Sequence, residues 1–249
     1  MHVYIYDSFL NHNKYHNLLA RIETRITDLG LNGKICRLGA SKNYSATIQD
    51  EIKRGAKTII AVGNDETINQ VINAMNGSDI PLGIIPVGKT ESLIATSLGV
   101  GRELLACDIL SARRIEKLDL VLANETLFLT EGKITTKESV IEINQGYSIE
   151  ILESGEVSII NLPLSSVDLP STGKFKPDDG LLEVFIKTKE TTNFLKKSVG
   201  QSVFTTEELT LDNKSYLLRV DNSIDIKTPI KIKACPQCLN VIVGKNRTF

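Results

Sequence analysis

Short apolar stretches alternate with amphipathic stretches over the first 117 residues of the chain. Continuous apolar runs bounded by turn residues predict strands that are buried on both faces. Residues 58–62 are such a run, and residues 2–6, 33–38 and 82–86 are also predicted to be strands. Between and after them, apolar side chains recur at the spacing of one helix face, which predicts helices. These helices fall around residues 18–29, 47–54, 68–75, 93–98 and 103–110. The alternation is typical of a parallel sheet covered by helices.

The pattern changes after residue 117, where turn residues separate short segments rich in β-branched residues. These segments lie at residues 118–123, 126–130, 139–143, 147–152, 157–161, 181–186, 216–220, 230–234 and 240–243. Short strands of this kind predict an antiparallel sandwich or barrel. We therefore expect an α/β plus all-β fold. A parallel-sheet α/β domain over residues 1–117 would precede an antiparallel β-sandwich domain over residues 118–249.

The amino-acid composition argues against several classes of function. The chain has 249 residues, and its 29 lysines and arginines nearly balance its 30 aspartates and glutamates. Because cationic side chains dominate the binding of duplex nucleic acid, this balance argues against a nucleic-acid partner. No apolar run is long enough to span a bilayer, and the N-terminus lacks the pattern of a signal peptide. The four cysteines are too few for a disulfide framework, so we expect reduced thiols and a cytoplasmic protein.

Residues 83–90, GIIPVGKT, match the P-loop pattern letter for letter. A P-loop wraps phosphates with the backbone N–H groups of flexible residues between its glycines. The four residues here are Ile-Ile-Pro-Val, which are typical of a strand, and proline has no N–H to donate. We therefore interpret this segment as a strand that leads into a loop at Gly88.

A strand–turn–helix pattern over residues 59–71 is a better candidate for binding phosphate. A tight turn at the start of a helix presents free backbone N–H groups and the positive end of the helix dipole. Ligands of open α/β sheets bind at the carboxyl ends of the strands, so this turn and the loop at Gly88 should face one crevice. Asp65 allows two interpretations: a role toward a ligand, or a simple cap of the helix that follows it.

Four segments, in the right order over most of the chain, resemble the diacylglycerol kinase-like lipid kinases. This bacterial family is related to sphingosine kinases and, more distantly, to NAD kinases. Residues 61–71, AVGNDETINQV, are similar to the family's GGDGT-x-N-E-V turn and helix. Residues 81–92, PLGIIPVGKTES, with ATSLGV at 95–100, resemble its PLGIIPLGTGNDFA-x-SLGI stretch. Residues 118–129 resemble the strand pair that opens its second domain, and residues 174–184, KFKPDDGLLEV, resemble PxAxxDDGLLdV.

The resemblance implies a cleft between two domains that binds ATP and passes the γ-phosphoryl group to a lipid hydroxyl. The family's nucleotide-binding positions fall on two loops of this sequence: Gly63, Asn64, Asp65, Glu66, Thr67 and Asn69, and then Gly88, Lys89 and Thr90. The implied metal is Mg²⁺, held in the second domain by Asp179 and the carbonyl oxygens of Lys176 and Leu181. Oxygen ligands of this kind suit that ion. Asp65 and Asp221 are the candidates for catalysis, with Asp221 as a substitute general base.

The motifs depart from the family pattern at positions that matter for phosphoryl transfer. Asn64 and Glu66 replace glycines, and Glu66 adds negative charge where phosphates are expected. Lys89 is the cation that would compensate for Glu66. The family's D-G-E, whose glutamate is the general base, reads Asp221-Asn-Ser223 here, and a serine cannot perform that role unaided. Two functions stay open: an active lipid kinase, and a catalytically inactive nucleotide- or lipid-binding protein on the same fold.

Cys235 and Cys238 form a CxxC pair between two predicted strands. A zinc site needs four ligands and the sequence offers no second pair, so we interpret the segment as a β-turn. As partners we expect a nucleotide, a lipid head group met transiently at the membrane surface, and a second copy of the chain in a homodimer.

Overall fold

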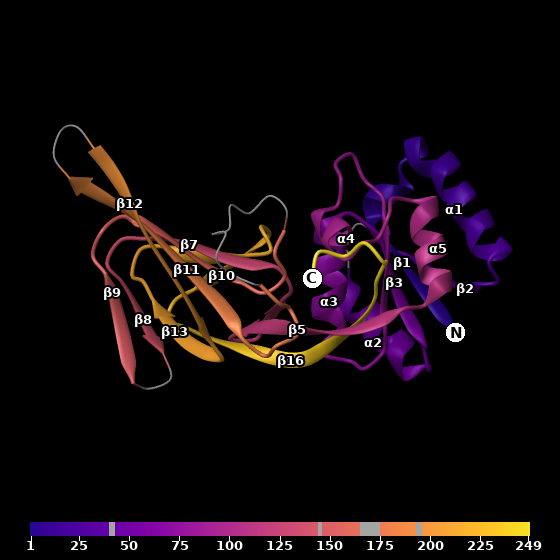
Figure 1. The fold of residues 1–249 in the computed structure, drawn as a ribbon. Helices are drawn as coiled ribbons and strands as arrows, with labels where there is room; N and C mark the ends of the chain where they lie inside the picture. The colour runs from indigo at the N-terminus through magenta and orange to yellow at the C-terminus, as the bar shows by residue number, and fades with distance from the viewer. Residues whose placement is uncertain (40–42, 144–145, 165–174, 193–195) are drawn as a thin grey trace. The chain divides into compact units, whose positions relative to one another are not determined.

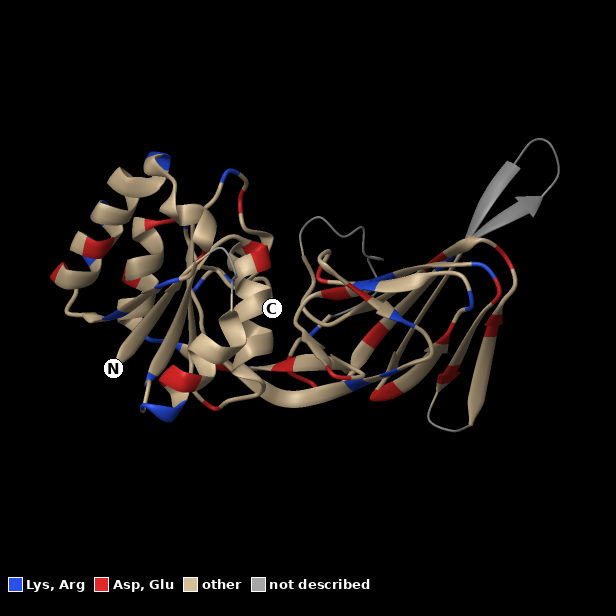
Figure 2. Cartoon of the chain, turned by 180° about the vertical axis from the view of Figure 1, so that it is seen from behind, with Lys and Arg blue, Asp and Glu red and all other residues tan. Residues whose placement is uncertain are grey.

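The structure is a computed structural model that describes residues 1–39, 43–143, 146–164, 175–192 and 196–249. The chain forms two compact units. Unit 1 contains Met1–Leu118 and Cys238–Phe249, and unit 2 contains Asp119–Pro163 with the described residues from 175 to 237. Residues 238–249, which the sequence pattern assigns to the second domain, therefore lie in unit 1. Acidic and basic residues are dispersed over each unit (Figure 2). Within the described ranges, no helix has both the length and the apolar character needed to cross a membrane.

Unit 1 is built on a parallel sheet (Figure 1). Its strands are β1 (His2–Tyr6), β2 (Gly33–Arg37), β3 (Thr58–Gly63), β4 (Leu82–Pro86) and the C-terminal part of β16 (Ile230–Ile242). They lie in the order β2-β1-β3-β4-β16. Every residue of β3 and β4 is buried, which explains why these strands are continuous apolar runs in the sequence.

The helices of unit 1 cover both faces of this sheet. After β1 come two short 3₁₀ helices, η1 (Ser8–Asn11) and η2 (Asn13–Tyr15); the α-helices are α1 (His16–Asp28), α2 (Tyr44–Lys53), α3 (Asp65–Met75), α4 (Leu93–Ser97) and α5 (Leu104–Ala112). Figure 1 shows α1 and α5 on one side of the sheet and α2 and α3 on the other. Helix α1 buries Leu19, Ile22 and Ile26, which form one apolar stripe at helical spacing.

Unit 2 consists of antiparallel sheets. One contains β5 (Ile115–Ala123), β6 (Thr126–Phe128), β8 (Ser139–Ile143), β9 (Tyr147–Ile151), β13 (Glu208–Asp212) and the first part of β16. The other has the order β12-β11-β10-β7-β14-β15, with β7 (Glu131–Thr136), β10 (Gly155–Ile160), β11 (Leu182–Thr192), β12 (Lys196–Thr206), β14 (Leu217–Val220) and β15 (Ile224–Lys227). Apolar residues of both sheets form one core, which includes Phe128, Val157, Val184, Leu209 and Ile232. The predicted fold class, α/β plus all-β, is confirmed.

The sequence pattern does not indicate β7, β12, β13 or β15. Strands β13 and β15 are alternating segments of only five and four residues. Strand β7 reads EGKITT and has a single large apolar side chain, Ile134. Such segments become strands because neighbouring strands pair with them, which a local pattern does not reveal.

The CxxC segment differs from its prediction in two ways. Strand β16 runs continuously from Ile230 to Ile242, where the sequence predicts two strands joined by a turn. Cys235 and Cys238 are disulfide-bonded, so the expectation of reduced thiols is wrong for this pair; Cys36 and Cys107 are free. A regular strand would hold two residues at this spacing about 10 Å apart, too far for a disulfide. Gln237 has a φ of 54°, and this bend in the strand shortens the separation.

Candidate functional site

The turn from β3 into α3 forms the first wall of a candidate ligand site in unit 1. Asn64 is the N-cap of α3, and its side-chain oxygen accepts the backbone N–H of Thr67 at 3.0 Å. Asp65 therefore does not cap this helix, contrary to one of the two interpretations of its role. A Cβ on Gly63 would lie 2.3 Å from the Thr67 hydroxyl oxygen, so the turn requires glycine at this position.

The loop after β4 forms the second wall, and Asp65 connects the two walls. One Asp65 carboxylate oxygen accepts the backbone N–H of Leu93 at 3.0 Å, and the other accepts the hydroxyl of Ser92. Ser92 is in turn the N-cap of α4, where its side chain accepts the N–H of Ala95. Asp65 thus holds the second loop against the first. Its role in catalysis stays a prediction.

A pocket of about 130 Å³ lies between the two walls. Of the predicted nucleotide-binding residues, Gly63, Asn64, Asp65, Glu66, Gly88 and Thr90 line it. The structure therefore brings the two predicted loops together, as expected from the carboxyl ends of neighbouring parallel strands. Lys89 is exposed and is not among the lining residues, whereas Arg102, which the sequence does not single out, is one of them.

Thr67 and Asn69, also predicted to bind nucleotide, are buried in α3, with exposed fractions of 0% and 2%. The Thr67 hydroxyl lies 2.9 Å from the carboxylate of Asp7 and 2.9 Å from the side-chain oxygen of Asn64. The side-chain oxygen of Asn69 has no hydrogen-bond partner within the described part of the chain. An unpaired buried amide oxygen is unfavourable, so it marks a position where a bound donor would be stabilising.

Asp7 is a buried residue behind the first loop that the sequence analysis does not identify, and it does not line the pocket. It follows β1 directly, and its side chain accepts the hydroxyl of Tyr44 at 2.6 Å as well as that of Thr67. Burial raises the pKa of Tyr44, and the hydrogen bond to Asp7 raises it further. This buried network connects β1, α2 and α3 and fixes the first turn of α3. The signal available in the sequence was an acidic residue at the carboxyl end of the first strand.

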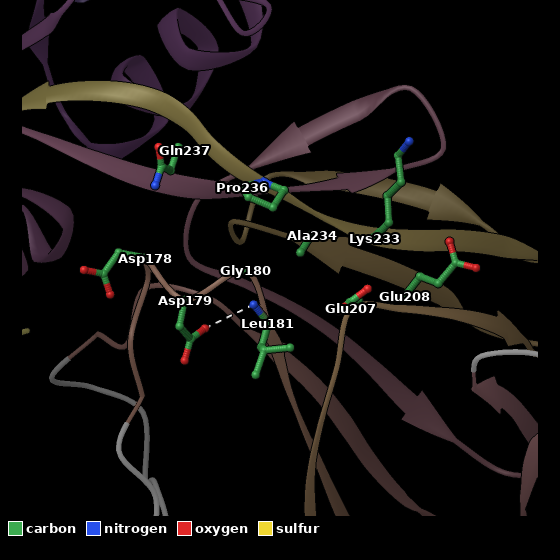
Figure 3. Close-up of a pocket in the computed structure, with 10 residues that line it drawn as sticks. All are labelled: Asp178, Asp179, Gly180, Leu181, Glu207, Glu208, Lys233, Ala234, Pro236 and Gln237. Atoms are coloured by element: carbon green, nitrogen blue, oxygen red, sulfur yellow. Dashed lines mark hydrogen bonds between the residues drawn. The ribbon is translucent and has the colours of Figure 1, made fainter.

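In unit 2, the predicted metal loop lines a pocket of about 730 Å³ (Figure 3). The Asp179 carboxylate accepts the backbone N–H of Leu181 at 3.1 Å, and both residues line the pocket. Asp119, fully buried, anchors this loop by accepting the N–H groups of Gly180 at 2.6 Å and Gln237 at 2.7 Å. Burial raises the pKa of Asp119, while these two hydrogen bonds oppose the rise.

Two buried carboxylates, those of Asp119 and Glu183, lie close to this loop. Glu183 is 4% exposed, and one of its carboxylate oxygens has no hydrogen-bond partner in the described ranges. Burial, with the negative charge of Asp179, raises the pKa of Glu183 to about 7. No three His, Cys, Asp or Glu side chains of the described residues converge as metal ligands, so a cation would also need backbone carbonyls. The predicted set, the Asp179 carboxylate with the backbone carbonyl oxygens of Lys176 and Leu181, would supply oxygen ligands of the kind that Mg²⁺ prefers. Asp179 is exposed, and the assignment of Mg²⁺ to this loop stays a prediction.

Asp221 begins the turn between β14 and β15. It and Asn222 have φ values of 47° and 57°, and the N–H of Ser223 donates to the carbonyl oxygen of Val220 at 3.0 Å, as in a type I′ turn. Its carboxylate accepts the hydroxyl of Thr130 at 2.5 Å and the backbone N–H groups of Thr130 at 3.0 Å and Leu129 at 3.3 Å. Burial raises the pKa of Asp221, and the bonds from Thr130 oppose the rise. The geometry gives Asp221 a structural role; a role as general base stays a prediction.

The sequence and the fold of the chain are similar to those of several known proteins. Residues 3–123 match the model of the diacylglycerol kinase catalytic domain. The crystal structure of a diacylglycerol kinase from Bacillus anthracis str. Sterne has the same fold, with a TM-score of 0.79, 18% identity, and coverage of 98% of this chain and 97% of that one. An uncharacterized protein of Synechocystis sp. is 23% identical over 85% of this chain and 63% of its own length. The probable lipid kinase YegS of Shigella flexneri is 46% identical over 57 residues, 21% of this chain and 19% of that protein. The matched regions thus span less than two thirds of either curated relative.

Proposed function

We propose that this protein binds ATP in the pocket of unit 1 and transfers the γ-phosphoryl group to a lipid hydroxyl, because residues 3–123 match the model of the diacylglycerol kinase catalytic domain. The pocket between the two loops is the observation that carries the proposal. Its volume of about 130 Å³ is below the roughly 300–1,000 Å³ of sites for whole drug-sized ligands. It therefore suits the phosphate groups, and the nucleoside would extend beyond it.

Phosphate binding in this pocket would depend on the backbone at the start of α3. The first N–H groups of an 11-residue helix have no partner within the helix, and the helix dipole favours anions there. The N–H of Thr67 is already bound by the Asn64 side chain, so phosphate would depend on the N–H groups that precede it. Glu66 opposes this effect, because its exposed side chain lines the same pocket. Phosphoryl transfer depends on positioning and on neutralising the phosphate charges. Mg²⁺ bound with the nucleotide would supply part of that positive charge.

A second Mg²⁺ would have a structural role in unit 2, at the loop of Asp179 with the carbonyl oxygens of Lys176 and Leu181. The buried carboxylate oxygen of Glu183 that has no hydrogen-bond partner among the described residues supports this assignment. For the whole protein we propose a cytoplasmic location, transient contact with lipid head groups at the membrane surface, and a homodimer.

A catalytically inactive nucleotide- or lipid-binding protein on the same fold is the second candidate. One specific observation favours it: the Asp221 carboxylate accepts three hydrogen bonds within unit 2, and the neighbouring Ser223 cannot act as a base unaided. A protein of this kind would bind ATP with the same loops and transfer nothing.

The experiment measures binding and transfer separately on the full chain. Thermal unfolding with ATP, ADP and NAD, with and without Mg²⁺, reports binding; a ligand at a hundred times its Kd stabilises by about 2.7 kcal/mol. In a protein of this size that raises the Tm by roughly 5–10 °C. Radiolabelled ATP with vesicles containing diacylglycerol or a sphingoid base then reports transfer.

Each outcome separates the candidates. A rise in Tm with ATP and Mg²⁺, together with a labelled lipid, supports the kinase. A rise in Tm without labelling of either lipid favours the inactive binding protein. No rise with any nucleotide refutes both nucleotide-dependent functions.

A further inference from the structure

Arg102 reaches into the pocket of unit 1 from outside both predicted nucleotide loops. It lies in the connection between α4 and α5, and its guanidinium donates a hydrogen bond to the carbonyl oxygen of Gly88 at 3.3 Å. Among the described residues that line the pocket, Arg102 is the one with a cationic side chain. A guanidinium has five N–H donors in a planar fork, so one bond to a carbonyl leaves several donors available.

An unusual backbone conformation places Arg102 there. The next residue, Glu103, has a φ of 52°, a left-handed value that is uncommon for residues other than glycine. Its backbone N–H donates to the carbonyl oxygen of Pro86, the last residue of β4, at 3.3 Å. This bond ties the start of α5 to the strand end that carries the second loop. Conformations of this kind persist where the surrounding structure enforces them and often accompany binding sites.

The charge of Arg102 is not neutralised by a carboxylate in the described part of the chain. Five of the nine guanidinium groups pair with carboxylates among the described contacts, those of Arg25, Arg37, Arg54, Arg219 and Arg247, and Arg102 belongs to the remaining four. Of the acidic residues that line the pocket with Arg102, Asp65 is engaged by the second loop, and Glu91 accepts the hydroxyl of Thr96 at 3.1 Å. Glu66 lines the pocket without forming an ion pair to Arg102 among the described contacts. Arg102 is therefore a cation held at a pocket without a partner anion.

We propose that Arg102 binds a terminal phosphate of the nucleotide and supplies, from the α4–α5 connection, the positive charge that offsets Glu66. This inference rests on the proposed nucleotide binding and adds the residue that selects for a polyphosphate. A guanidinium is suited to this task because its fork matches two phosphate oxygens at once. The sequence suggests Lys89 for the same role, but Lys89 does not line the pocket.

The test measures the affinities of the full-length protein for ATP, ADP and AMP by calorimetry with Mg²⁺ present, at low and high salt. Four variants are compared with the wild type: Arg102→Ala, Arg102→Lys, Lys89→Ala and Glu66→Gln. Arg114→Ala is the matched control, because Arg114 is an exposed arginine of unit 1 outside the pocket. Circular dichroism and the Tm of each protein without ligand report whether the variant is folded.

We expect Arg102→Ala to weaken ATP and ADP binding about 10- to 100-fold, the range for loss of a charge-assisted hydrogen bond, and to affect AMP much less. Arg102→Lys should recover part of the loss, and Glu66→Gln should tighten ATP binding. The dependence of ATP affinity on salt should become shallower in Arg102→Ala, because one charge has left the site. Arg114→Ala should bind like the wild type.

Three results would overturn the inference while nucleotide binding stands. They are unchanged ATP affinity in a folded Arg102→Ala variant, equal losses for ATP and AMP, and a larger loss in Lys89→Ala than in Arg102→Ala. If the wild type itself binds none of the three nucleotides, the proposed function fails together with the inference.

Discussion

Replacing Asp221 with alanine removes the acceptor for three hydrogen bonds inside unit 2. The two donors of Thr130 and the backbone N–H of Leu129 would lose their partner, and both residues are at least 98% buried. A buried donor left without an acceptor costs about 1–3 kcal/mol. Two backbone N–H groups left without an acceptor therefore predict a loss of about 2–6 kcal/mol in the free energy of unfolding. Asp221→Asn keeps one acceptor oxygen, so about 1–2 kcal/mol is expected.

Thermal unfolding of the full chain, followed by circular dichroism in the β region, measures this loss. About 4 kcal/mol corresponds to a fall in Tm of roughly 8–16 °C for a protein of this size. Ser223→Ala is the matched control, because Ser223 is an exposed residue of the same turn and should change the stability by less than about 0.5 kcal/mol. If Asp221→Ala unfolded within about 2 °C of the control, the three hydrogen bonds would not stabilise the fold, and the structural assignment of Asp221 would be refuted.

Three further predictions concern single positions. Gly63→Ala places a Cβ 2.3 Å from a buried threonine hydroxyl, so urea titration should show a loss of about 1–3 kcal/mol; an unchanged midpoint would mean that the turn relaxes freely. Asp179→Asn should abolish the rise in Tm that Mg²⁺ gives the wild type, whereas Asp178→Asn should retain it; equal losses would place the ion elsewhere. Burial raises the pKa of Cys107 to about 11 and also raises that of Cys36. At about pH 8 a smaller fraction of each side chain is therefore deprotonated to the reactive thiolate than for an exposed cysteine. Mass spectrometry after maleimide treatment should find the half-buried Cys36 labelled slowly and Cys107 unlabelled, with the rate for Cys36 rising with pH; faster labelling of Cys107 would contradict this.

The sequence predicts the centre of the unit 1 sheet well because β3 and β4 are buried along their whole length. Strands β1, β3 and β4 are continuous apolar runs, and each is followed by turn residues, so both nucleotide loops could be located from the pattern. The last strand of this sheet could not be placed in the same way. Val241 pairs with Leu82 across more than 150 residues, and no local pattern encodes such a partner.

The parts of the site that the sequence does not predict depend on tertiary contacts. Arg102 enters the pocket because the positive φ of Glu103 and its bond to Pro86 direct the chain there. Asp221 resembles a displaced catalytic base in the sequence, yet its carboxylate binds Thr130, about 90 residues away along the chain. Asp65 was correctly placed at the first loop, but its bonds to the second loop could not be inferred from spacing.

Unit 1 is completed by residues 238–249, the last to be synthesised, and this has a consequence for folding during synthesis. Val243 donates its N–H to the carbonyl oxygen of Arg114 at 2.9 Å, and Thr248 donates to that of Ser97 at 3.0 Å. At usual elongation rates, Ser97 and Arg114 leave the ribosome on the order of ten seconds before residues 238–249. During that interval β4 has an open edge, which is a template for unwanted pairing. A nascent or truncated chain that stops before Cys238 should therefore aggregate or recruit chaperones, even though it contains all residues of both nucleotide loops.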